Sequence, residues 1–424
     1  MYEPRRISSG YRGSPGTGYS VLVAAAKAPR AAGPKTASTD VSTSGSGPTL
    51  SLRALGRATL ARQMLLARER TTVLAAVERL VGMQAQLARP PYVGLWTRLH
   101  GFAREDLSGA LQRREVVRAT LMRCTLHLMS ARDYLQLRAV IQPVLDRAMQ
   151  SVLRERTDGL GLPALISAAR GHLQQKPRTF EALRDLLVEG DPEGDARAMG
   201  YAVRCLLPLV QVPTDTPWGF PAAADFALAD EWLGTAIPGG EASPLPLVRR
   251  YLAAFGPASV SDMQTWSGLQ GLREVFEQLR PTLLTFRDDR GRELFDLPDA
   301  PRPPEDIDAP VRFLPDFDNL VLGHDDRRRL ISDEHRAAIF LPNLRILPTF
   351  LVDGRIAGTW KVEAKKASAT LVIEPFTAVS RPARGALTEE GDLLLRFLEP
   401  EAASFAVRVA GASTTKPRRT SKPK

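Results

Sequence analysis

The sequence predicts an α+β protein built from tandem winged-helix modules followed by a β-rich C-terminal part. Segments with apolar residues at helical spacing recur in three rounds, and each round closes on short strand-like runs. A later segment, 343–376, differs from these rounds because Asp353 and Gly354 stand between two strand-like runs. Such an Asp-Gly pair is a strong local signal for a β-hairpin, which makes the C-terminal part β-rich.

The first round, 51–158, is predicted as the first winged-helix module, with folded sequence from Ser51. Its helices are expected at 57–70, 72–83 (with Thr71 as N-cap), 106–114 and 131–156. Between the last two helices, 115–130 changes to short β-rich runs around Met122 and Arg123, as a hairpin would.

Two further modules are expected at 159–240 and 241–310. The second has helical patterns at 163–174, 179–189 and 195–209, followed by a Pro-rich, strand-like stretch through Phe220. The third contains "PLVRRYLAAF" and "GLREVFEQLRP" as helices and closes on 283–298, where 289–292 forms a turn between two strand-like runs. The C-terminal domain, 311–411, adds the strand "ATLVIEPF" and ends on a helix-like piece, 388–406.

Most of the net charge lies in the two terminal segments. The chain of 424 residues has a formal charge of +10. Segment 1–50, rich in Gly, Ser, Thr, Pro and Ala, is predicted to be a disordered extension, and its basic residues outnumber the acidic ones by four. Segment 412–424 is predicted to be a disordered tail with five basic residues and no acid, suited to salt-sensitive attachment to phosphates. The core is therefore near neutral, and any anion-binding surface there depends on how its arginines are arranged.

Several classes of site and location are disfavoured by composition. Cys124 and Cys205 are the only cysteines, which argues against a disulfide framework or a cysteine-based zinc site. The five histidines show no paired ligand spacing, so we expect no metal and no cofactor. No apolar run reaches the roughly 20 residues of a membrane span. The run at 19–28 is short and late for a signal peptide, so a cytoplasmic protein is expected.

Gln84 and Gln86 lie one residue apart where the helical pattern of 72–83 meets two prolines, in "VGMQAQLARPPYVGLW". If the helix continued, Gln84 would lie on its apolar stripe and Gln86 would point roughly the opposite way. If the backbone became extended, both side chains would share a face and Ala85 would point away from it. Taken alone, the spacing fits two helix-end glutamines bonded to solvent, since glutamine is mostly exposed.

Five motifs, in order along 51–375, resemble the AlkZ-like (AlkZ/YcaQ-related) winged-helix DNA-binding family. They are "LVGMQAQLARPPYVGLWTRL", "VRATLMRCTLHLMSARDYLQLR", "YLAAFGPASVSDMQTWSGL", "FLPDFDNLVLGHDDRRRLI" and "LVDGRIAGTW". The resemblance implies tandem winged helices, a β-rich C-terminal part and, as in characterised members, a DNA glycosylase that excises alkylated purines and unhooks interstrand crosslinks.

The family signature is a glutamine, a hydrophobic residue, then a glutamine or aspartate, which corresponds here to Gln84, Ala85 and Gln86. The third position resembles the AlkZ branch, and Ala85 is a small version of the hydrophobic position. The resemblance implies that both glutamines are catalytic. An N7-alkylated guanine is already positively charged, so neutral amides that orient water and partly stabilise charge on the sugar suffice for its release.

Three more residues are candidates for support of the active site. His127 lies in the segment that resembles the family's hairpin near the active site, and a hydrogen-bonded structural histidine is the competing interpretation. Tyr92 and Trp96 follow the glutamines and could stack on a displaced base, although aromatic residues at helical spacing more often belong to a core.

Arginines of two segments are candidate phosphate contacts. Arg118 and Arg123 lie on the first predicted hairpin, and Arg327, Arg328 and Arg329 lie in "HDDRRRL". The second group has the competing interpretation of a solvated face paired with its local acids.

We therefore expect a monofunctional DNA glycosylase for bulky or crosslinking alkyl-purine lesions. Its expected partner is double-stranded DNA, without a membrane, and the expected state is a monomer. Two other hypotheses stay open, because winged helices place helices in DNA grooves but also bind proteins. One is a non-catalytic DNA-binding protein such as a transcriptional regulator, and the other is an interaction scaffold that does not bind DNA.

Overall fold

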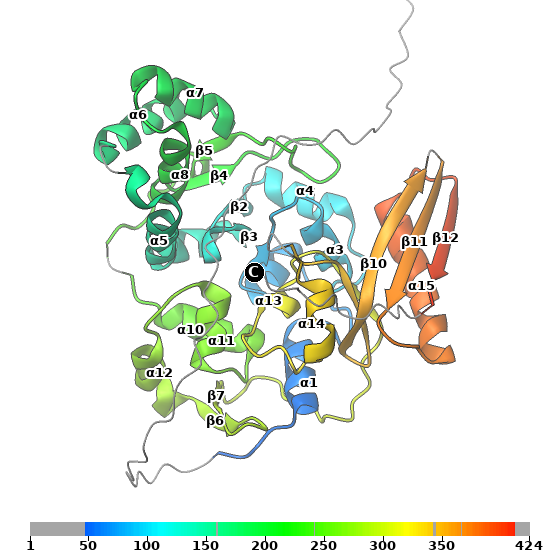
Figure 1. The fold of residues 1–424 in the computed structure, drawn as a ribbon. Coiled ribbons are helices and arrows are strands. Elements are labelled where there is room, and N and C mark those ends of the chain that lie inside the picture. The colour runs from blue at the N-terminus through cyan, green and yellow to red at the C-terminus, as the bar shows by residue number, and fades with distance from the viewer. Residues whose placement is uncertain (1–46, 158–159, 241, 342–344, 366, 412–424) are drawn as a thin grey trace, which may run out of the picture.

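The computed structural model describes residues 47–157, 160–240, 242–341, 345–365 and 367–411 (Figure 1). The predicted α+β class is confirmed, because helices and three separate sheets are interspersed along the whole described chain. The predicted extension and basic tail fall almost wholly outside the described residues. Of the extension, 47–50 is described, and there the Leu50 amide donates to the Arg287 carbonyl at 2.8 Å.

The first two helices have other bounds than the sequence predicts. The helix expected at 57–70 spans Leu52–Arg62, and the one expected at 72–83 spans Val73–Arg79. Helix α1 starts after Ser51, whose hydroxyl accepts from the Ala54 amide, and α2 starts after Thr72 instead of Thr71. Helix α2 ends at Arg79 because Val81 and Gly82 take left-handed backbone conformations, with φ of 54° and 83°. The elements are α1 (Leu52–Arg62), α2 (Val73–Arg79), β1 (Met83–Gln84), α3 (Pro90–Trp96) and α4 (Arg104–Gln112).

The predicted hairpin of 115–130 is confirmed, and its strands belong to a larger sheet. Strands β2 (Val116–Thr120) and β3 (Leu126–Ser130) pair antiparallel across a 3-10 turn, Met122–Cys124. The five-stranded sheet has the order β1-β3-β2-β4-β5. Its last two strands, β4 (Leu209–Gln211) and β5 (Phe226–Leu228), come from the second predicted module, so one sheet joins both modules.

Helices α5, α6 and α9 pack against this sheet (Figure 1). The longest, α5, ends at Leu153 and not at residue 156 as expected. It packs on α8 through a core that includes Tyr134, Ile141, Ala202 and Cys205. The helices of this part are α5 (Ala131–Leu153), α6 (Leu162–Gln175), α7 (Phe180–Gly190), α8 (Ala196–Leu206) and α9 (Ala229–Leu233).

The third region has the predicted order of helices and a two-stranded turn. Strands β6 (Leu284–Arg287) and β7 (Glu293–Asp296) pair antiparallel on either side of the expected turn. The buried guanidinium of Arg62 binds both oxygens of Asp296 at 2.6 and 2.8 Å, which fastens α1 to this hairpin. The helices here are α10 (Leu245–Phe255), α11 (Val260–Ser267) and α12 (Arg273–Leu279).

The C-terminal part holds a second five-stranded sheet, of order β12-β11-β10-β9-β8. Asp353 and Gly354 form the predicted hairpin turn, with φ of 48° and 73°. The expected helix at 388–406 is partly wrong, because α15 ends at Leu398 and Ser404–Val409 forms β12, parallel to β11. The strands are β8 (Arg312–Leu314), β9 (Thr349–Val352), β10 (Arg355–Lys365), β11 (Ser368–Pro375) and β12, and the helices are α13 (Asn319–Leu322), α14 (Asp333–Ile339) and α15 (Arg381–Leu398).

The C-terminal sheet lies with α15 on one side of the molecule, opposite α6 and α7, and α3, α13 and α14 lie between (Figure 1). Among the described residues, no helix has both the length and the apolar character to cross a membrane.

Candidate functional site

Gln84 lies in strand β1, and the bend that follows it and carries Gln86 is fixed to the first hairpin. In β1 the Cα atoms of Gln84 and His127 are paired, and the Ala85 amide donates to the Leu126 carbonyl at 2.7 Å. Arg118 donates from Nε to the Ala85 carbonyl at 2.8 Å and from Nη2 to the Gln86 carbonyl at 3.2 Å. The helix therefore does not continue through Gln84: the strand covers Met83–Gln84, the backbone bends at Gln86, and Ala85 between them is fully buried.

Gln84 is held by a guanidinium. Its Oε1 accepts from Arg123 Nη2 at 2.6 Å, while Nη1 of the same arginine donates to the Trp266 carbonyl. A guanidinium carries donors only, so the oxygen of the Gln84 carboxamide must face Arg123. The amide nitrogen makes no hydrogen bond to the described residues and stays available as a donor. The Gln84 side chain is nevertheless 8% exposed, so only a small part of it reaches the surface.

Gln86 is half-buried and less tightly held. Its Oε1 accepts from the Leu126 backbone amide at 3.3 Å, which turns this carboxamide towards the hairpin that also carries His127 and Arg123. A backbone amide can only donate, so here too the oxygen faces the protein. Both carboxamides therefore contact the same hairpin, Gln84 at Arg123 of its turn and Gln86 at Leu126 of β3.

His127 is buried beside this pair and is neutral. Burial, together with the charge of Arg123, lowers its pKa to about 3. Its Nδ1 lies 3.0 Å from the Thr125 carbonyl, which can only accept, so Nδ1 carries the proton. Its Nε2 lies 3.4 Å from Arg123 Nη2 and is then the acceptor. His127 thus supports the arginine that holds Gln84, and the structural interpretation of this histidine is the one that its contacts favour.

The backbone around Arg123 is unusual. Arg123 and Cys124 both have positive φ, 54° and 55°, in a turn where neither residue is glycine. Such conformations are costly and persist where surrounding contacts enforce them. Here Cys124 Sγ lies 3.9 Å from Cys205 Sγ of α8, and both thiols are free. The turn is therefore fixed from one side by α8 and from the other by Gln84 and Trp266.

Of the two aromatic candidates, Tyr92 belongs to the core and Trp96 is half-buried against it. Tyr92 is fully buried, its hydroxyl lies 3.1 Å from Ser108 Oγ, and its ring meets Trp218 edge-on. The Trp96 ring stacks on Phe397 and carries the Arg68 guanidinium 4.4 Å from its centre. Stacking of Tyr92 on a displaced base is a wrong expectation, because its ring is fully buried, whereas the half-buried Trp96 already contacts Phe397 and Arg68.

The five candidate arginines differ in burial and in pairing. Arg118 and Arg329 are buried and bind backbone carbonyls, and Arg328 pairs with Asp289 and Asp326. A phosphate contact by Arg118 or Arg329 is therefore a wrong expectation, because burial withholds both from a duplex. The local-acid alternative describes Arg328.

Arg123 and Arg327 are half-buried and have no carboxylate partner among the described residues. Arg327 donates to the carbonyls of Val321 and Asp325, and its guanidinium lies over the Phe340 ring. Burial lowers the pKa of both arginines to about 10, and the charge of Arg327 adds to the effect on Arg123. The charge of Arg327, in "HDDRRRL", therefore acts on Arg123, the residue that holds Gln84.

Sequence reasoning missed two polar residues of "FLPDFDN": Asn319, which binds the segment before Gln84, and Asp318, which binds Arg98 after α3. Asn319 Nδ2 donates to the Gly82 carbonyl at 2.6 Å and to the Leu80 carbonyl at 3.2 Å. Asp318 binds Arg98 through two hydrogen bonds of 2.8 and 2.9 Å, and both side chains are buried. The motif was visible in the sequence, but nothing local indicated that its polar residues are directed at a segment more than 200 positions earlier.

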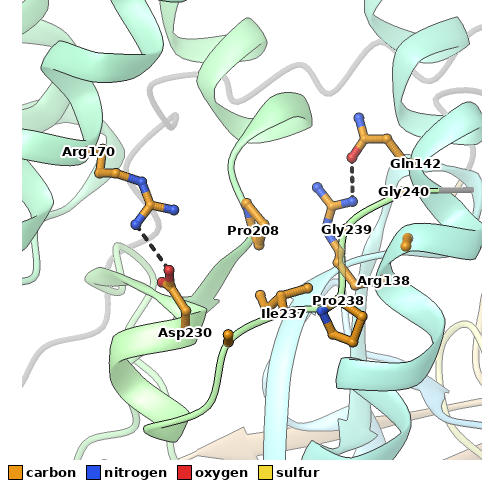
Figure 2. A pocket seen from close by; sticks show the side chains of 11 residues that line it. Arg138, Gln142, Arg170, Pro208, Asp230, Ile237, Pro238, Gly239 and Gly240 are labelled. Atoms are coloured by element: carbon orange, nitrogen blue, oxygen red, sulfur yellow. Dashed lines mark hydrogen bonds and ion pairs between the residues drawn. The ribbon is translucent and has the colours of Figure 1, made fainter.

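A hollow of about 340 Å³ lies elsewhere, between α5, α6 and the segment after α9 (Figure 2). Arg138 and Gln142 are joined by a hydrogen bond at one side of it, and Arg170 pairs with Asp230 at 3.0 Å on the other. None of the site residues predicted from the sequence lines this hollow. Within the described part of the chain, no group of three or more His, Cys, Asp or Glu residues is placed to hold a metal ion.

Comparison with a solved structure identifies the fold first. The fold matches that of the Streptomyces sahachiroi DNA glycosylase AlkZ with a TM-score of 0.70, over 85% of this chain and 100% of that chain, at 22% sequence identity. The two chains therefore share one fold.

Sequence comparison then gives the family. The family model "DNA glycosylase AlkZ-like" matches residues 77–397, and the chain belongs to this family, as its motifs predicted. A curated relative, the "Interstrand DNA cross-link repair glycosylase" of Streptomyces sahachiroi, is 29% identical over 184 residues. That alignment covers 41% of this chain and 44% of the relative, so it spans less than half of the relative's length.

Proposed function

We propose that this protein is a monofunctional DNA glycosylase that removes N7-alkylated or interstrand-crosslinked purines from duplex DNA. The observation that carries the proposal is the placement of Gln84 and Gln86 on one short segment that is hydrogen-bonded to the first hairpin, with both carboxamides against that hairpin. Family membership over 77–397, a range that contains this segment, supports it, as does the name of the curated relative.

The proposed reaction replaces the C1′–N9 bond by a bond from C1′ to water oxygen. The electron pair of the broken bond returns to the purine, which neutralises its positive charge, and the attacking water loses a proton to solvent. Because the leaving base is already cationic, the protein has mainly to position water and to favour the charge that develops on the sugar. Neutral carboxamides are adequate for that task.

The contacts suggest different roles for the two glutamines. The Gln84 oxygen faces a cation, so it is poorly placed to favour positive charge on a sugar, and the amide nitrogen is the group that Gln84 offers. Gln86 has the longer contact, 3.3 Å, and is the more exposed, so its carboxamide can turn to orient water. We assign substrate contact by donation to Gln84 and the positioning of water to Gln86.

The proposal includes the winged-helix organisation. Modules at 51–158, 159–240 and 241–310 each combine helices with an antiparallel strand pair, namely β2–β3, β4–β5 and β6–β7. The β-rich domain at 311–411 follows. Such modules dock helices against a duplex. We further propose that the protein works as a monomer in the cytoplasm, where a repair enzyme of this family would meet DNA.

The test is release of N7-methylguanine from alkylated duplex DNA. We expect wild type to release it, and Gln84→Ala with Gln86→Ala to lower the single-turnover rate by about 100-fold or more. Gln174→Ala, on the exposed surface of α6, is the matched control and should keep the wild-type rate. Equal rates for wild type and the double variant would remove the catalytic role. No release by wild type, with retention on DNA at moderate salt, would favour the non-catalytic DNA-binding protein.

A further inference from the structure

An exposed leucine directly follows the proposed catalytic pair. Leu87 is 51% exposed, although it adjoins a segment in which Met83, Gln84 and Ala85 are buried. Among the described residues the exposed large hydrophobic side chains are Leu87, Leu284, Ile307 and Leu393. Isolated apolar side chains on a surface are ordinary. Leu87 differs from the other three because its neighbour in the chain is Gln86.

Leu87 is held on a short, stiff connection. On its N-terminal side Arg118 binds the carbonyls of Ala85 and Gln86. On its C-terminal side α3 starts at once with Pro90 and Pro91, whose rings fix the backbone. Only Leu87, Ala88 and Arg89 lie between these two fixed points. The leucine therefore cannot fold back into the core without moving the segment that carries both glutamines.

An enzyme that acts on a base inside a duplex must take that nucleotide out of the stack. The vacated space has apolar walls, formed by the faces of the neighbouring base pairs, and proteins that distort duplexes insert leucine and similar side chains between base steps. Leu87 is aliphatic, its backbone is fixed on both sides, and it directly follows Gln86, which would meet the displaced nucleotide. It therefore has the chemistry and the position for such an insertion.

We propose that Leu87 is a wedge that enters the base stack of duplex DNA as the alkylated nucleotide turns towards Gln84 and Gln86. This inference rests on the proposed glycosylase function. It assigns to Leu87 the recognition of duplex substrate, because only a duplex has a paired stack to fill. The base itself is met by the glutamines, so a single strand carrying the same lesion does not need the wedge.

The first experiment compares Leu87→Ala with wild type on N7-methylguanine in duplex and in single-stranded DNA. We expect the single-turnover rate to fall roughly tenfold or more on the duplex and less than twofold on the single strand. Leu393→Ala removes a leucine of matched exposure, 54%, from α15 and should leave both rates unchanged. Leu87→Met, which keeps a long apolar side chain, should restore most of the duplex rate.

A wild-type rate for Leu87→Ala on the duplex would overturn the proposal, and so would an equal loss on both substrates, since that would indicate a role within the site itself. A second measurement does not depend on catalysis. Wild type should raise the fluorescence of 2-aminopurine placed beside a tetrahydrofuran abasic analogue in a duplex, and Leu87→Ala should lose most of that rise at saturating protein. If wild type releases no base, the proposed function fails, and an unchanged fluorescence in the variant would then reject the wedge separately.

Discussion

Arg123 Nη2 lies 2.6 Å from Gln84 Oε1, which joins a left-handed residue of the hairpin turn to a strand residue 39 positions earlier. The pKa of Arg123 is about 10, so the guanidinium is charged at neutral pH. Both of its terminal nitrogens are used inside the protein, one by Gln84 and one by the Trp266 carbonyl. The first consequence is that Arg123 acts on the reaction through Gln84 and is a positioning residue.

Arg123→Met should lower kcat by about 100-fold and leave KM nearly unchanged, because the carboxamide of Gln84 loses the contact that fixes its orientation. Arg123→Lys keeps a charge and a donor and should recover part of the loss. The measurement is the rate of N7-methylguanine release against duplex concentration. A rise in KM with normal kcat would instead assign Arg123 to phosphate contact, the role expected from the sequence.

Arg327 and Arg328 are neighbours that should differ in DNA binding. Arg327 has no carboxylate within ion-pairing distance among the described residues, whereas Arg328 is neutralised by Asp289 and Asp326. Arg327→Ala should weaken binding equally for unrelated duplex sequences and reduce the slope of log affinity against log salt by about 1. Arg328→Ala is the internal control and should leave that slope unchanged. Equal slopes for the two variants would remove Arg327 from the interface.

His127 should make folding sensitive to acid. Its pKa of about 3 in the folded protein lies below the ordinary value of 6.5, so between these pH values the unfolded chain binds a proton that the folded chain does not. The free energy of unfolding therefore rises with pH through this window and levels off above it, by at most roughly 1.4 kcal/mol per pH unit for one group.

Urea unfolding of wild type and His127→Gln at pH 4.5, 5.5 and 7.5 checks this expectation. The variant should have a shallower dependence below pH 6.5 and the same dependence above pH 7, where the histidine is neutral in both states. His324, whose pKa is also lowered by burial, contributes equally to both proteins and cancels in the difference. Parallel curves throughout would show that His127 can take up a proton in the folded state.

The buried pair of Arg98 and Asp318 should stabilise the fold strongly at the end of α3. Asp318→Asn leaves a buried guanidinium without its counter-charge and should cost about 3–5 kcal/mol in the free energy of unfolding. Asp392→Asn breaks the exposed pair with Arg396 and should cost less than about 1 kcal/mol. Denaturant unfolding of both variants provides the comparison, and similar costs would show that the Arg98 site admits water.

Local signals in the sequence were sufficient for the elements and for some turns. The Asp353–Gly354 hairpin, the hairpin around Met122 and the two strands at 283–298 were all predicted, because turn residues and alternating patterns act over a few neighbouring positions. The ends of elements were less accurate. Helix α2 stops four residues earlier than expected, since Val81 and Gly82 turn left-handed with no marked breaker at Val81.

Five motifs along 51–375 were enough to indicate the family, and through its signature to select Gln84 and Gln86 as candidates. The tertiary structure decided which atoms of those side chains remain available, because Arg123, Leu126 and Asn319 reach the segment from distant parts of the chain. It also decided that Tyr92 and Arg118 are buried, whereas Leu87 is exposed. Backbone preferences depend on neighbouring residues, but burial and hydrogen-bond partners depend on which surfaces the folded chain brings together, and no local pattern records that.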